Sequence, residues 1–585
     1  MIINIEADKT TVSMGGSIKI SLNGGEEGHI LLPFINGRRW GHHERPDASG
    51  KAQFLLPLPN PGAARIQVAA IQSDTGHWMG LGKRRDLLLA GSRLPDGQVT
   101  SNIIDIEITW RAFAERRAGK TLFGIQWESW FTHGVRGWET AQAVPVVGFY
   151  NLYNRDVIRQ HVLWFMDLGV DFIFPDWTNH LWGLKHWDER PERANEIVHA
   201  TTLTLEVLAE MRDEGLPVPT MVLFSGLSNG HPATMEALNE ELAWIYHTYV
   251  RNPRFKGLWL EYEGKPLIVI LDTGALGDPR GTAESSYRIP FIKDTLEMSE
   301  AELDEFRKNQ VPVDDSQFTV RWMSSQNQTT RHHELGYWSW MDGVIDPPVT
   351  YRTIDGVAIA EAVTVTPAFF GAQGWTASDA YGRRGGATIM ETFKPAFKHR
   401  PRFIFLHQFN EFTGQIEGEA RGPDKDIYGD TYNVELSDDL EPVSISAPGY
   451  RGDAGGWGFY YLNLTKALMD LYRNPNKECT LLVVTNPLRG ATITGETVDV
   501  AWSIFGKAPQ HYTVLLDGRV ALDEFTGHHT TISLDQAADG PHTISVLANG
   551  TQTFYRLSMT ELEGRLDLLI PAQVDVPIML RRSGA

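Results

Sequence analysis

Residues Arg400–Glu417, RPRFIFLHQFNEFTGQIE, carry the strongest structural signal in the chain. The apolar run Phe403–Leu406 passes directly into Gln408, Asn410 and Glu411, which is typical of a buried strand that ends in polar side chains. In a (β/α)₈ barrel, side chains at the C-terminal ends of the strands line the active site. The stretch therefore predicts a barrel strand that places Glu411 for chemistry. The alternative is an ordinary solvated carboxylate just past a core strand.

The region before this strand alternates apolar strand-like runs with helical periodicity, the pattern of βα units around a parallel sheet. Seven further strand candidates are Thr121–Glu128, Val170–Trp177, Thr220–Ser225, Pro266–Asp272, Phe318–Met323, Tyr337–Asp342 and Glu361–Thr366. Helical stretches are Asp156–Leu168, Ala194–Glu214, Thr234–Tyr249, Ser299–Asn309 and, after the last strand, Gly458–Arg473. Eight strands are the number that a closed TIM barrel needs.

Both ends of the chain have short strand-like runs in place of the alternating strand and helix pattern of the middle. Short β-runs separated by Gly, Pro, Asn and Asp fill the first hundred or so residues and return from Cys479, where Asp517-Gly518 signals a hairpin. This spacing is typical of antiparallel sandwiches. The sequence thus predicts an α/β chain of three domains: an N-terminal β-sandwich at 1–115, a (β/α)₈ TIM barrel at 116–477 and a C-terminal, Ig-like β-sandwich at 478–585.

Bulk composition narrows the function classes. The 53 basic and 73 acidic residues give a formal net charge of −20, which makes nucleic acid and anionic membranes poor partners and favours a neutral or cationic ligand. The single cysteine, Cys479, excludes an internal disulfide and a thiolate metal cluster. No segment reaches 18 apolar residues, so a cytoplasmic protein is the default expectation. A secreted or periplasmic protein whose leader was removed is the alternative, and the oligomeric state stays open.

Carboxylates, amides and aromatic rings gather at the predicted strand ends, as a sugar site requires. Two carboxyl groups flank the scissile bond of a glycoside, while amides bind hydroxyls and indoles stack on the sugar ring. The predicted catalytic residues are Glu411 first, with Asp176 as its partner, and then Glu128 and Asp272. The predicted substrate-binding residues are Trp127, Trp177, Asn179, His180, Trp340, Gln408, Asn410 and Glu417. For each single tryptophan the alternative is a core position.

The run Phe409–Glu417, FNEFTGQIE, resembles the N-E-W-H-E-G-T-Q-I-E signature on the last barrel strand of glycoside hydrolase families 71 and 99. Arg159–Trp177 is similar to their second βα unit, and Gly264–Val269 resembles the entry to their fourth strand. The resemblance covers roughly residues 120 to 475, and only the last-strand motif is specific. It implies a barrel enzyme that acts on α-linked glycans.

In the mannosidase family, the first motif glutamate assists the substrate 2-hydroxyl and the second is the general acid/base. The resemblance gives Glu411 the first position. The second has no counterpart, because Thr413-Gly414 follow Phe412 where His-Glu-Gly would stand. Glu417, Asp176 and Glu128 remain as candidates for the acid.

Two other motifs keep alternatives open. Gly226–Gly230 matches G-x-S-x-G after a strand, which would make Ser228 an esterase nucleophile, although His231-Pro232 delays the following helix. The loop Asp424–Glu435 matches several positions of an EF-hand, so it is either a Ca²⁺ site or a solvated acidic loop.

The sequence therefore predicts a glycoside hydrolase that cleaves an α-linked bond in an oligo- or polysaccharide and requires no cofactor. The alternatives are a catalytically inactive carbohydrate-binding protein and the Ser228 esterase. The long segment Gly418–Gly456 is expected to fold over the cleft and to contribute Asp or Tyr side chains, because long loops without secondary structure are usually functional or disordered.

Overall fold

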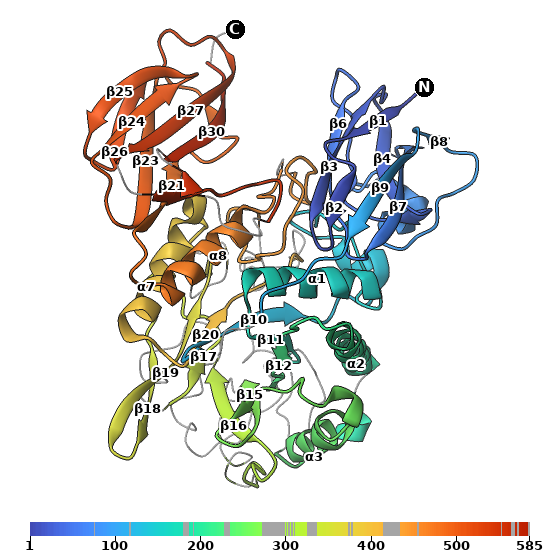
Figure 1. Cartoon of the computed structure of the whole chain (residues 1–585), viewed down its shortest axis with the longest axis vertical. Coiled ribbons are helices and arrows are strands. Elements are labelled where there is room, and N and C mark those ends of the chain that lie inside the picture. Colours follow the sequence, from blue (N-terminus) through green and yellow to red (C-terminus); the bar gives the residue numbers. More distant parts are fainter. Residues whose placement is uncertain are drawn as a thin grey trace.

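The computed structural model describes most of the chain. The described residues are 1–74, 77–115, 119–178, 186–190, 192–226, 235–271, 299, 301, 305, 308, 311–324, 336–371, 375, 378–413, 433–452, 455–550, 553–562, 568–569 and 572–582. Figure 1 shows a mixed α/β molecule in which a central sheet with its helices lies below two groups of β-strands, one near each chain end.

The central sheet is the element that positions the site. Its strands are β10 (Leu122–Glu128), β11 (Phe172–Asp176), β12 (Thr220–Met221), β13 (Phe224–Gly226), β14 (Glu261–Tyr262), β15 (Lys265–Leu271), β16 (Thr319–Ser324), β17 (Trp338–Ser339), β18 (Thr350–Ile354), β19 (Val357–Val365) and β20 (Phe403–Leu406). Nine of them follow one path, β17-β16-β15-β13-β11-β10-β20-β19-β18, and β12 and β14 pair at its side. Every pair along this path is parallel except β18 with β19.

The two ends of the parallel run approach each other. Among the described residues no ladder joins β17 to β19, but the Trp338 indole of β17 donates to Glu361 of β19 at 2.9 Å, and the Thr364 hydroxyl donates to the Ser339 carbonyl. The result is a near-closed, barrel-like sheet. Each of the eight predicted strands has a counterpart in it, although Thr220–Ser225 is divided into β12 and β13, and Tyr337–Asp342 shortens to Trp338–Ser339.

Strand alternation sorts the apolar side chains of this sheet into two layers, because successive residues face opposite sides. Phe172, Phe174, Phe403 and Phe405 belong to a cluster inside the sheet, together with residues of β13, β15 and β16. A Cβ on Gly124 would come within 2.2 Å of the Phe172 ring, so only glycine fits there. The intervening residues of the same strands belong to the larger core outside the sheet.

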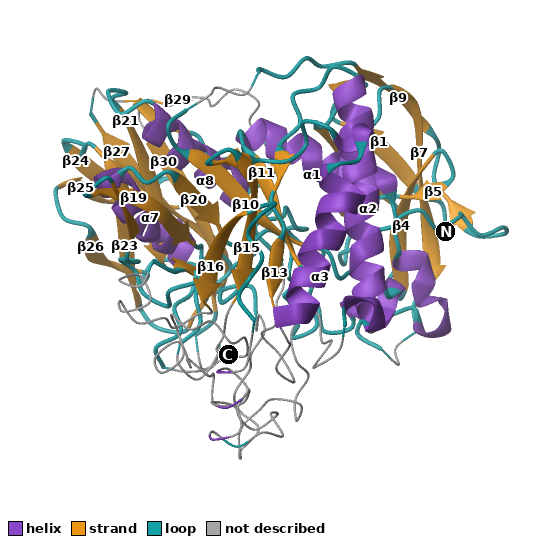
Figure 2. Ribbon diagram, turned by 90° about the horizontal axis from the view of Figure 1, so that it is seen from below, coloured by secondary structure: helices purple, strands orange, loops and turns teal. Residues whose placement is uncertain are grey.

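Helices cover the outer face. They are α1 (Arg155–Leu168), α2 (Glu192–Asp213), α3 (Met235–Ile245), α7 (Ala387–His399) and α8 (Tyr460–Arg473). Figure 2 shows α1 to α3 along one part of the sheet and α7 with α8 along another. Asn154 caps α1 by accepting from the Asp156 N–H, and Gly169 ends it at φ 81°. The predicted helix Ser299–Asn309 lies largely outside the described residues, and α7, which contains Pro395, was not predicted.

Short 3-10 or π turns complete the helical elements. They are η1 (Gly82–Leu88), η2 (Gly134–Trp138), η3 (Trp187–Glu189), η4 (Tyr246–Val250), η5 (Pro253–Phe255) and η6 (Arg384–Gly386). The turn η2 lies in the connection from β10 to α1, and its Trp138 ring is 5.8 Å from the ring of Phe412, the residue after Glu411. The β10–α1 connection thus packs against the predicted catalytic stretch.

The N-terminal strands form a three-stranded sheet, β1-β3-β6, and a sheet in the order β2-β9-β7-β4-β5 with β8 on β7. Their bounds are β1 (Asn4–Ala7), β2 (Thr11–Ser13), β3 (Ser17–Asn23), β4 (His29–Ile35), β5 (Arg38–Arg39), β6 (Ala52–Pro57), β7 (Gly62–Gln72), β8 (Val99–Thr100) and β9 (Ile104–Thr109). The apolar residues of these sheets belong to the same continuous core as the outer face of the central sheet.

The C-terminal strands form two five-stranded sheets, β26-β23-β21-β28-β29 and β22-β30-β27-β24-β25. Their bounds are β21 (Cys479–Asn486), β22 (Thr492–Ile493), β23 (Thr497–Gly506), β24 (His511–Leu516), β25 (Arg519–Phe525), β26 (His529–Ser533), β27 (Gly540–Asn549), β28 (Thr553–Tyr555), β29 (Leu568–Leu569) and β30 (Ala572–Leu580). Asp517-Gly518 makes the predicted hairpin between β24 and β25. Residues of both sheets share a core of their own.

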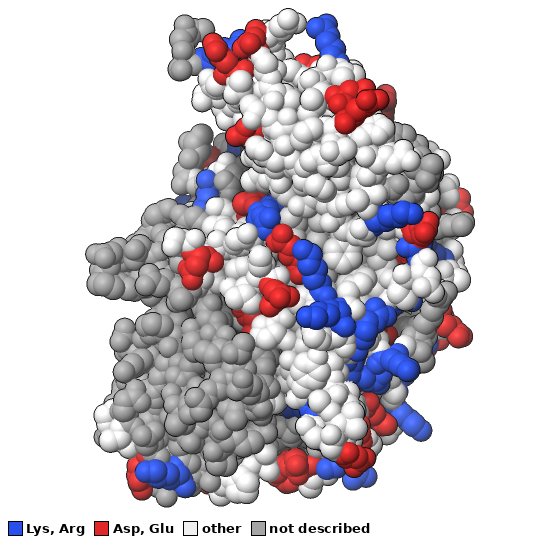
Figure 3. All heavy atoms as spheres, turned by 90° about the vertical axis from the view of Figure 1, so that its left-hand side faces the viewer, with Lys and Arg blue, Asp and Glu red and all other residues white. Residues whose placement is uncertain are grey.

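The surface carries charges of both signs, and on the face in Figure 3 basic and acidic side chains lie among one another. In the part of the chain that the structure describes, no helix is long and apolar enough to cross a membrane.

Candidate active site

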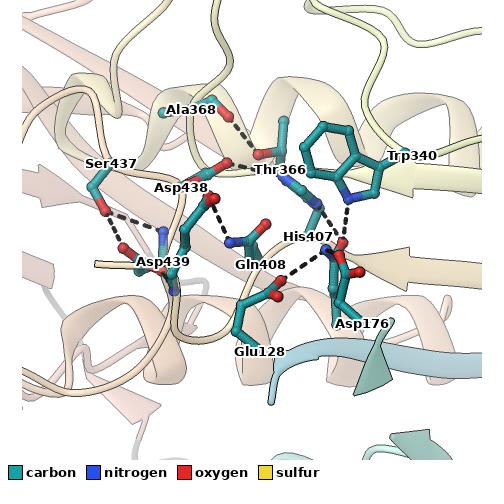
Figure 4. A network of polar contacts seen from close by, with 12 residues as sticks. Glu128, Asp176, Trp340, Thr366, Ala368, His407, Gln408, Ser437, Asp438 and Asp439 are labelled. Atoms are coloured by element: carbon teal, nitrogen blue, oxygen red, sulfur yellow. Dashed lines mark hydrogen bonds and ion pairs between the residues drawn. The ribbon is translucent and has the colours of Figure 1, made fainter. Parts of the chain in front are cut away.

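The site forms where β10 and β11 end side by side. Parallel pairing brings Glu128 opposite Asp176, and alternation along each strand turns both toward the inside of the sheet, in line with the Phe172–Phe174 row. Both side chains are buried. Figure 4 shows Glu128, Asp176, Trp340 and His407 grouped in one polar network, together with residues of the segment that follows β20.

A single amide connects the two carboxylates. The Gln126 Nε2 donates to Glu128 Oε1 at 2.9 Å and to Asp176 Oδ2 at 3.0 Å. Asp176 Oδ1 also accepts from the Thr178 N–H at 2.6 Å. Asp176 thus has a second strong donor, whereas Glu128 Oε2 has no hydrogen-bond partner among the residues that the structure describes.

Because their environments differ, the carboxyl groups of Glu128 and Asp176 have different pKa values. Burial, followed by the charge of Asp176, raises the pKa of Glu128 well above its ordinary value. Burial also raises the pKa of Asp176, to about 6, but the hydrogen bonds from Thr178 and the charge of His407 oppose that rise. Asp176 is therefore the more acidic of the two and ionises first, while Glu128 keeps its proton to higher pH, which is the pattern of a general acid beside a nucleophile or base.

The oxygen of the same amide has two neighbours. Gln126 Oε1 accepts from the Trp340 indole N–H at 2.6 Å and lies 2.8 Å from His407 Nδ1. On the other side of the imidazole, His407 Nε2 lies 2.9 Å from Asp438 Oδ2. His407 and Asp438 are both about 1% exposed, so this contact is shielded from water.

Glu411 lies at the same end of the sheet, five residues beyond β20. The Gln408 amide donates to Glu411 Oε2 at 2.7 Å. Asp439 fixes the turn, because its carboxylate accepts from the backbone N–H groups of Glu411 and of Phe412, a residue at φ 48°. Burial and the neighbouring Asp438 raise the pKa of Asp439 to about 7.

A second layer of polar contacts holds the strand ends together. Asn410 Oδ1 accepts from the Glu128 N–H at 2.8 Å, and Asn410 Nδ2 donates to the Tyr150 hydroxyl at 3.0 Å. Tyr150 donates in turn to Glu441 at 2.8 Å. The predicted site residue Asn410 thus bonds to the backbone beside Glu128.

No family model and no curated protein matches the chain. Among solved structures, it is similar to the GH99 endo-α-mannosidase from Bacteroides thetaiotaomicron, with 14% identity and a TM-score of 0.38 over 62% of this chain and 99% of that one. A putative β-galactosidase from Bacteroides fragilis matches with 9% identity and a TM-score of 0.30, over 100% and 74% of the two chains. A β-glucuronidase from Bacteroides uniformis matches with 9% identity and a TM-score of 0.28, over 99% and 61%.

These neighbours are glycoside hydrolases by name. Their identities to this chain are 14% or lower and their TM-scores are below 0.5.

The structure brings the predicted residues Glu128, Asp176, Gln408, Glu411 and Trp340 to one end of the sheet. It places the other two predicted tryptophans elsewhere. Trp127 is buried in the outer core, where its indole N–H donates to His161 of α1 at 3.2 Å, and the Trp177 indole donates to Thr201 of α2 at 2.9 Å. Alternation explains this difference, because a residue next to an inward-facing carboxylate faces the helices. The core alternative therefore describes both indoles.

Several predicted residues lie outside the described part of the chain, namely Asp272, Asn179, His180, Glu417, Ser228 and residues 424–432 of the acidic loop. Glu435, at the end of that loop, is described and accepts from the Arg384 N–H at 2.7 Å. Among the described residues, no group of three His, Cys, Asp or Glu side chains could hold a metal ion.

Three residues of the network were missed by the sequence reading. Asp438 and Asp439 belong to the segment Gly418–Gly456, which was expected to contribute Asp side chains, but nothing in the sequence distinguished them from its other acidic residues. His407 had a signal. It continues the inward-facing series Phe403, Phe405 of β20, so alternation alone places its ring inside the sheet.

Proposed function

We propose that the protein is a glycoside hydrolase in which Glu128 is the general acid/base and Asp176 the nucleophile. The observation that carries this proposal is the shared Gln126 amide, which holds two carboxyl groups of different acidity at adjacent strand ends. Glycosidases of the common type need this combination: one carboxyl group that keeps its proton at neutral pH and one that is ionised.

The reaction would proceed in two steps. Glu128 gives its proton to the glycosidic oxygen while an Asp176 oxygen attacks the anomeric carbon, so the C–O bond to the leaving group breaks as a glycosyl ester forms. In the second step, Glu128 as carboxylate takes a proton from water, and the hydroxyl oxygen displaces Asp176 from the anomeric carbon. Both residues return to their starting protonation states.

The hydrogen-bond geometry favours retention of configuration. The two N–H bonds of an amide diverge by about 120°, so acceptors on both of them lie about 5 Å apart. Retaining glycosidases hold their carboxyl groups at about 5–5.5 Å, whereas inverting enzymes need about 6.5–9.5 Å to admit a water molecule.

Unused acceptors in the same network support a ligand rich in hydroxyl groups. Among the described residues, Gln408 Oε1 and Asp438 Oδ1 are buried without a hydrogen-bond partner. Glu128 Oε2 is also unpartnered there and, because Oε1 accepts from Gln126, it is the oxygen that carries the proton for the leaving group. Buried polar atoms are normally paired, and leaving them unpaired costs about 1–3 kcal/mol each. The hydroxyl groups of a sugar are donors that can satisfy such acceptors. We assign to the Glu411 carboxylate the role of binding one substrate hydroxyl group.

We further propose that the near-closed sheet is a (β/α)₈ barrel spanning residues 116–477, with β-sandwich domains at 1–115 and 478–585. The parallel order of β10, β11, β13, β15, β16, β17, β19 and β20 supports the barrel. That the substrate bond is α-linked rests on the resemblance of Phe409–Glu417 alone.

The proposal is tested by incubating the protein with α- and β-linked oligosaccharides and identifying the products by mass spectrometry. We expect hydrolysis of an α-linked member, with the product released first in the anomeric configuration of the substrate. Binding without cleavage would favour the inactive carbohydrate-binding protein. Cleavage of an acyl ester instead, abolished by Ser228→Ala, would favour the esterase.

Glu411→Gln tests the third carboxyl group. The amide retains an acceptor for Gln408 but loses the charge that binds a substrate hydroxyl, and such contacts strengthen in the transition state. We expect kcat/KM to fall at least about a hundredfold, roughly 3 kcal/mol of transition-state stabilisation, at an unchanged melting temperature. A rate within about threefold of wild type would remove Glu411 from the mechanism.

A further inference from the structure

The protonation of His407 follows from its hydrogen-bond partners. An indole N–H can only donate, so Trp340 must face the oxygen of the Gln126 amide. The NH₂ group of that amide then faces Glu128 and Asp176, as their acceptor oxygens require. Because Gln126 Oε1 can only accept, His407 Nδ1 must carry a hydrogen and donate it.

The other ring nitrogen, Nε2, cannot then present only a lone pair to the Asp438 carboxylate, because two acceptors do not form a hydrogen bond. At 2.9 Å, His407 Nε2 and Asp438 Oδ2 must have one proton between them. Imidazole is more basic than a carboxylate by roughly 2–3 pH units in model peptides, which places that proton on the ring. The contact is therefore an imidazolium paired with a carboxylate, buried one amide away from the Glu128–Asp176 pair.

We propose that His407, held as an imidazolium by Asp438, is a positioning residue that keeps Asp176 ionised beside a protonated Glu128. The assignment of the proton stands on geometry alone, whereas its use in catalysis rests on the proposed function. The arrangement has a physical logic: two carboxyl groups on one amide would otherwise resist ionisation together, and a positive charge nearer to one of them selects which ionises.

The charges around His407 fit this assignment. Asp438 faces it from the segment after β20, while Asp176 on β11 and Glu128 on β10 lie beyond Gln126. The charge of His407 lowers the pKa of Asp176, and those of Asp438 and Asp439 raise the pKa of Glu128. A second buried cation, Arg383, donates to the Asp439 carbonyl and lies over the rings of Trp457 and Tyr461.

Nuclear magnetic resonance on protein with ¹⁵N-labelled histidine tests the proton directly. We expect His407, assigned from its loss in His407→Asn, to show two protonated ring nitrogens at pH 7.5. In Asp438→Asn, the new amide can donate to Nε2, so the ring should become neutral with its hydrogen on Nδ1. A neutral His407 in the wild-type protein at pH 7.5 would overturn the proposal, whether or not the protein turns over.

The pH dependence of kcat/KM tests the effect on Asp176. In Asp438→Asn we expect the acidic limb, which reports ionisation of Asp176, to move upward by about half a pH unit or more, because the nearby cation is lost. His407→Asn keeps a donor for Gln126 but removes the cation, so it should move the limb in the same direction, and the double variant should move it no further. Glu241→Gln, a buried carboxyl group on α3 that bonds to Ser225, is the matched control.

A merely structural role would lower the rate or the melting temperature without moving the limb. An unmoved limb in both single variants would therefore overturn the proposed effect on Asp176. If neither wild type nor variants hydrolyse any glycan while His407 is an imidazolium, the proposed function fails and the proton assignment stands.

Discussion

Glu128→Gln should abolish most of the turnover while leaving the fold intact. The glutamine oxygen can still accept from Gln126, and its NH₂ group takes the place of Oε2, which none of the described residues hydrogen-bonds. The variant loses only the proton that the leaving group needs. General acid–base assistance is typically worth about 10²–10⁴-fold, or roughly 3–5 kcal/mol of barrier, and kcat/KM should fall by that much.

The melting temperature supplies the second readout. Replacing a buried carboxyl group by an amide removes the cost of burying a group that is ionised in the unfolded chain, so we expect Glu128→Gln to be as stable as wild type at pH 4 and more stable at pH 8. Glu210→Gln, an exposed change on α2, is the matched control and should leave the rate unaltered. Activity of Glu128→Gln within about threefold of the wild-type value would contradict the assignment of the acid.

The stability of the protein should fall as pH rises from about 5.5 to 8.5. Burial raises the pKa of Asp176 to about 6, of Asp439 to about 7 and of Glu241 to about 8. The native state therefore binds these protons more tightly than the unfolded chain does, so the stabilisation is fully present below the unfolded-state pKa values of about 4, is lost progressively as the pH rises above them, and is gone once each native pKa is passed. For Glu241 alone, the difference is on the order of a few kcal/mol.

Glu241→Gln isolates the largest of these contributions. Its carboxyl group accepts from Ser225 at 2.9 Å through one oxygen, and the other oxygen has no partner in the described part of the chain. We expect the wild-type melting temperature to drop by several degrees between pH 5.5 and 8.5, and the drop to be clearly smaller in Glu241→Gln. Parallel curves for the two proteins would show that Glu241 titrates normally in the native state.

The strands that could be predicted from the sequence are those whose apolar runs end abruptly in polar residues. Phe403–Leu406 and the runs before Glu128 and Asp176 are of this kind, and their ends do meet in one network. The helix α7 was missed because Gly385-Gly386 before it and Pro395 within it signal a break, yet the helix Ala387–His399 packs eight buried side chains and keeps its form. Tertiary burial outweighs local propensity there.

The sequence did not show which face of the sheet each residue at a strand end would occupy. Residues next to each other at a strand end, such as Trp127 and Glu128, were assigned to one cleft, although alternation sends one to the helices and the other to the inside. Contacts between residues far apart in the sequence could not be predicted either. Asp438 contacts His407 although the two are 31 residues apart, and no local sequence pattern indicates such a contact.

The shared core of the N-terminal sheets and the central sheet has a consequence for how the polypeptide can be divided. Because the apolar side chains of β3, β4 and β7 continue into those around α1 without a break, the N-terminal sheets share one hydrophobic core with the central sheet. Truncating the chain after the N-terminal sheets would expose hydrophobic surface of the central sheet and its helices. We expect the truncated protein to aggregate. The C-terminal sheets enclose a core of their own, so we expect this portion to fold more independently than the N-terminal one. Strand β21 contributes one face to each of the two cores.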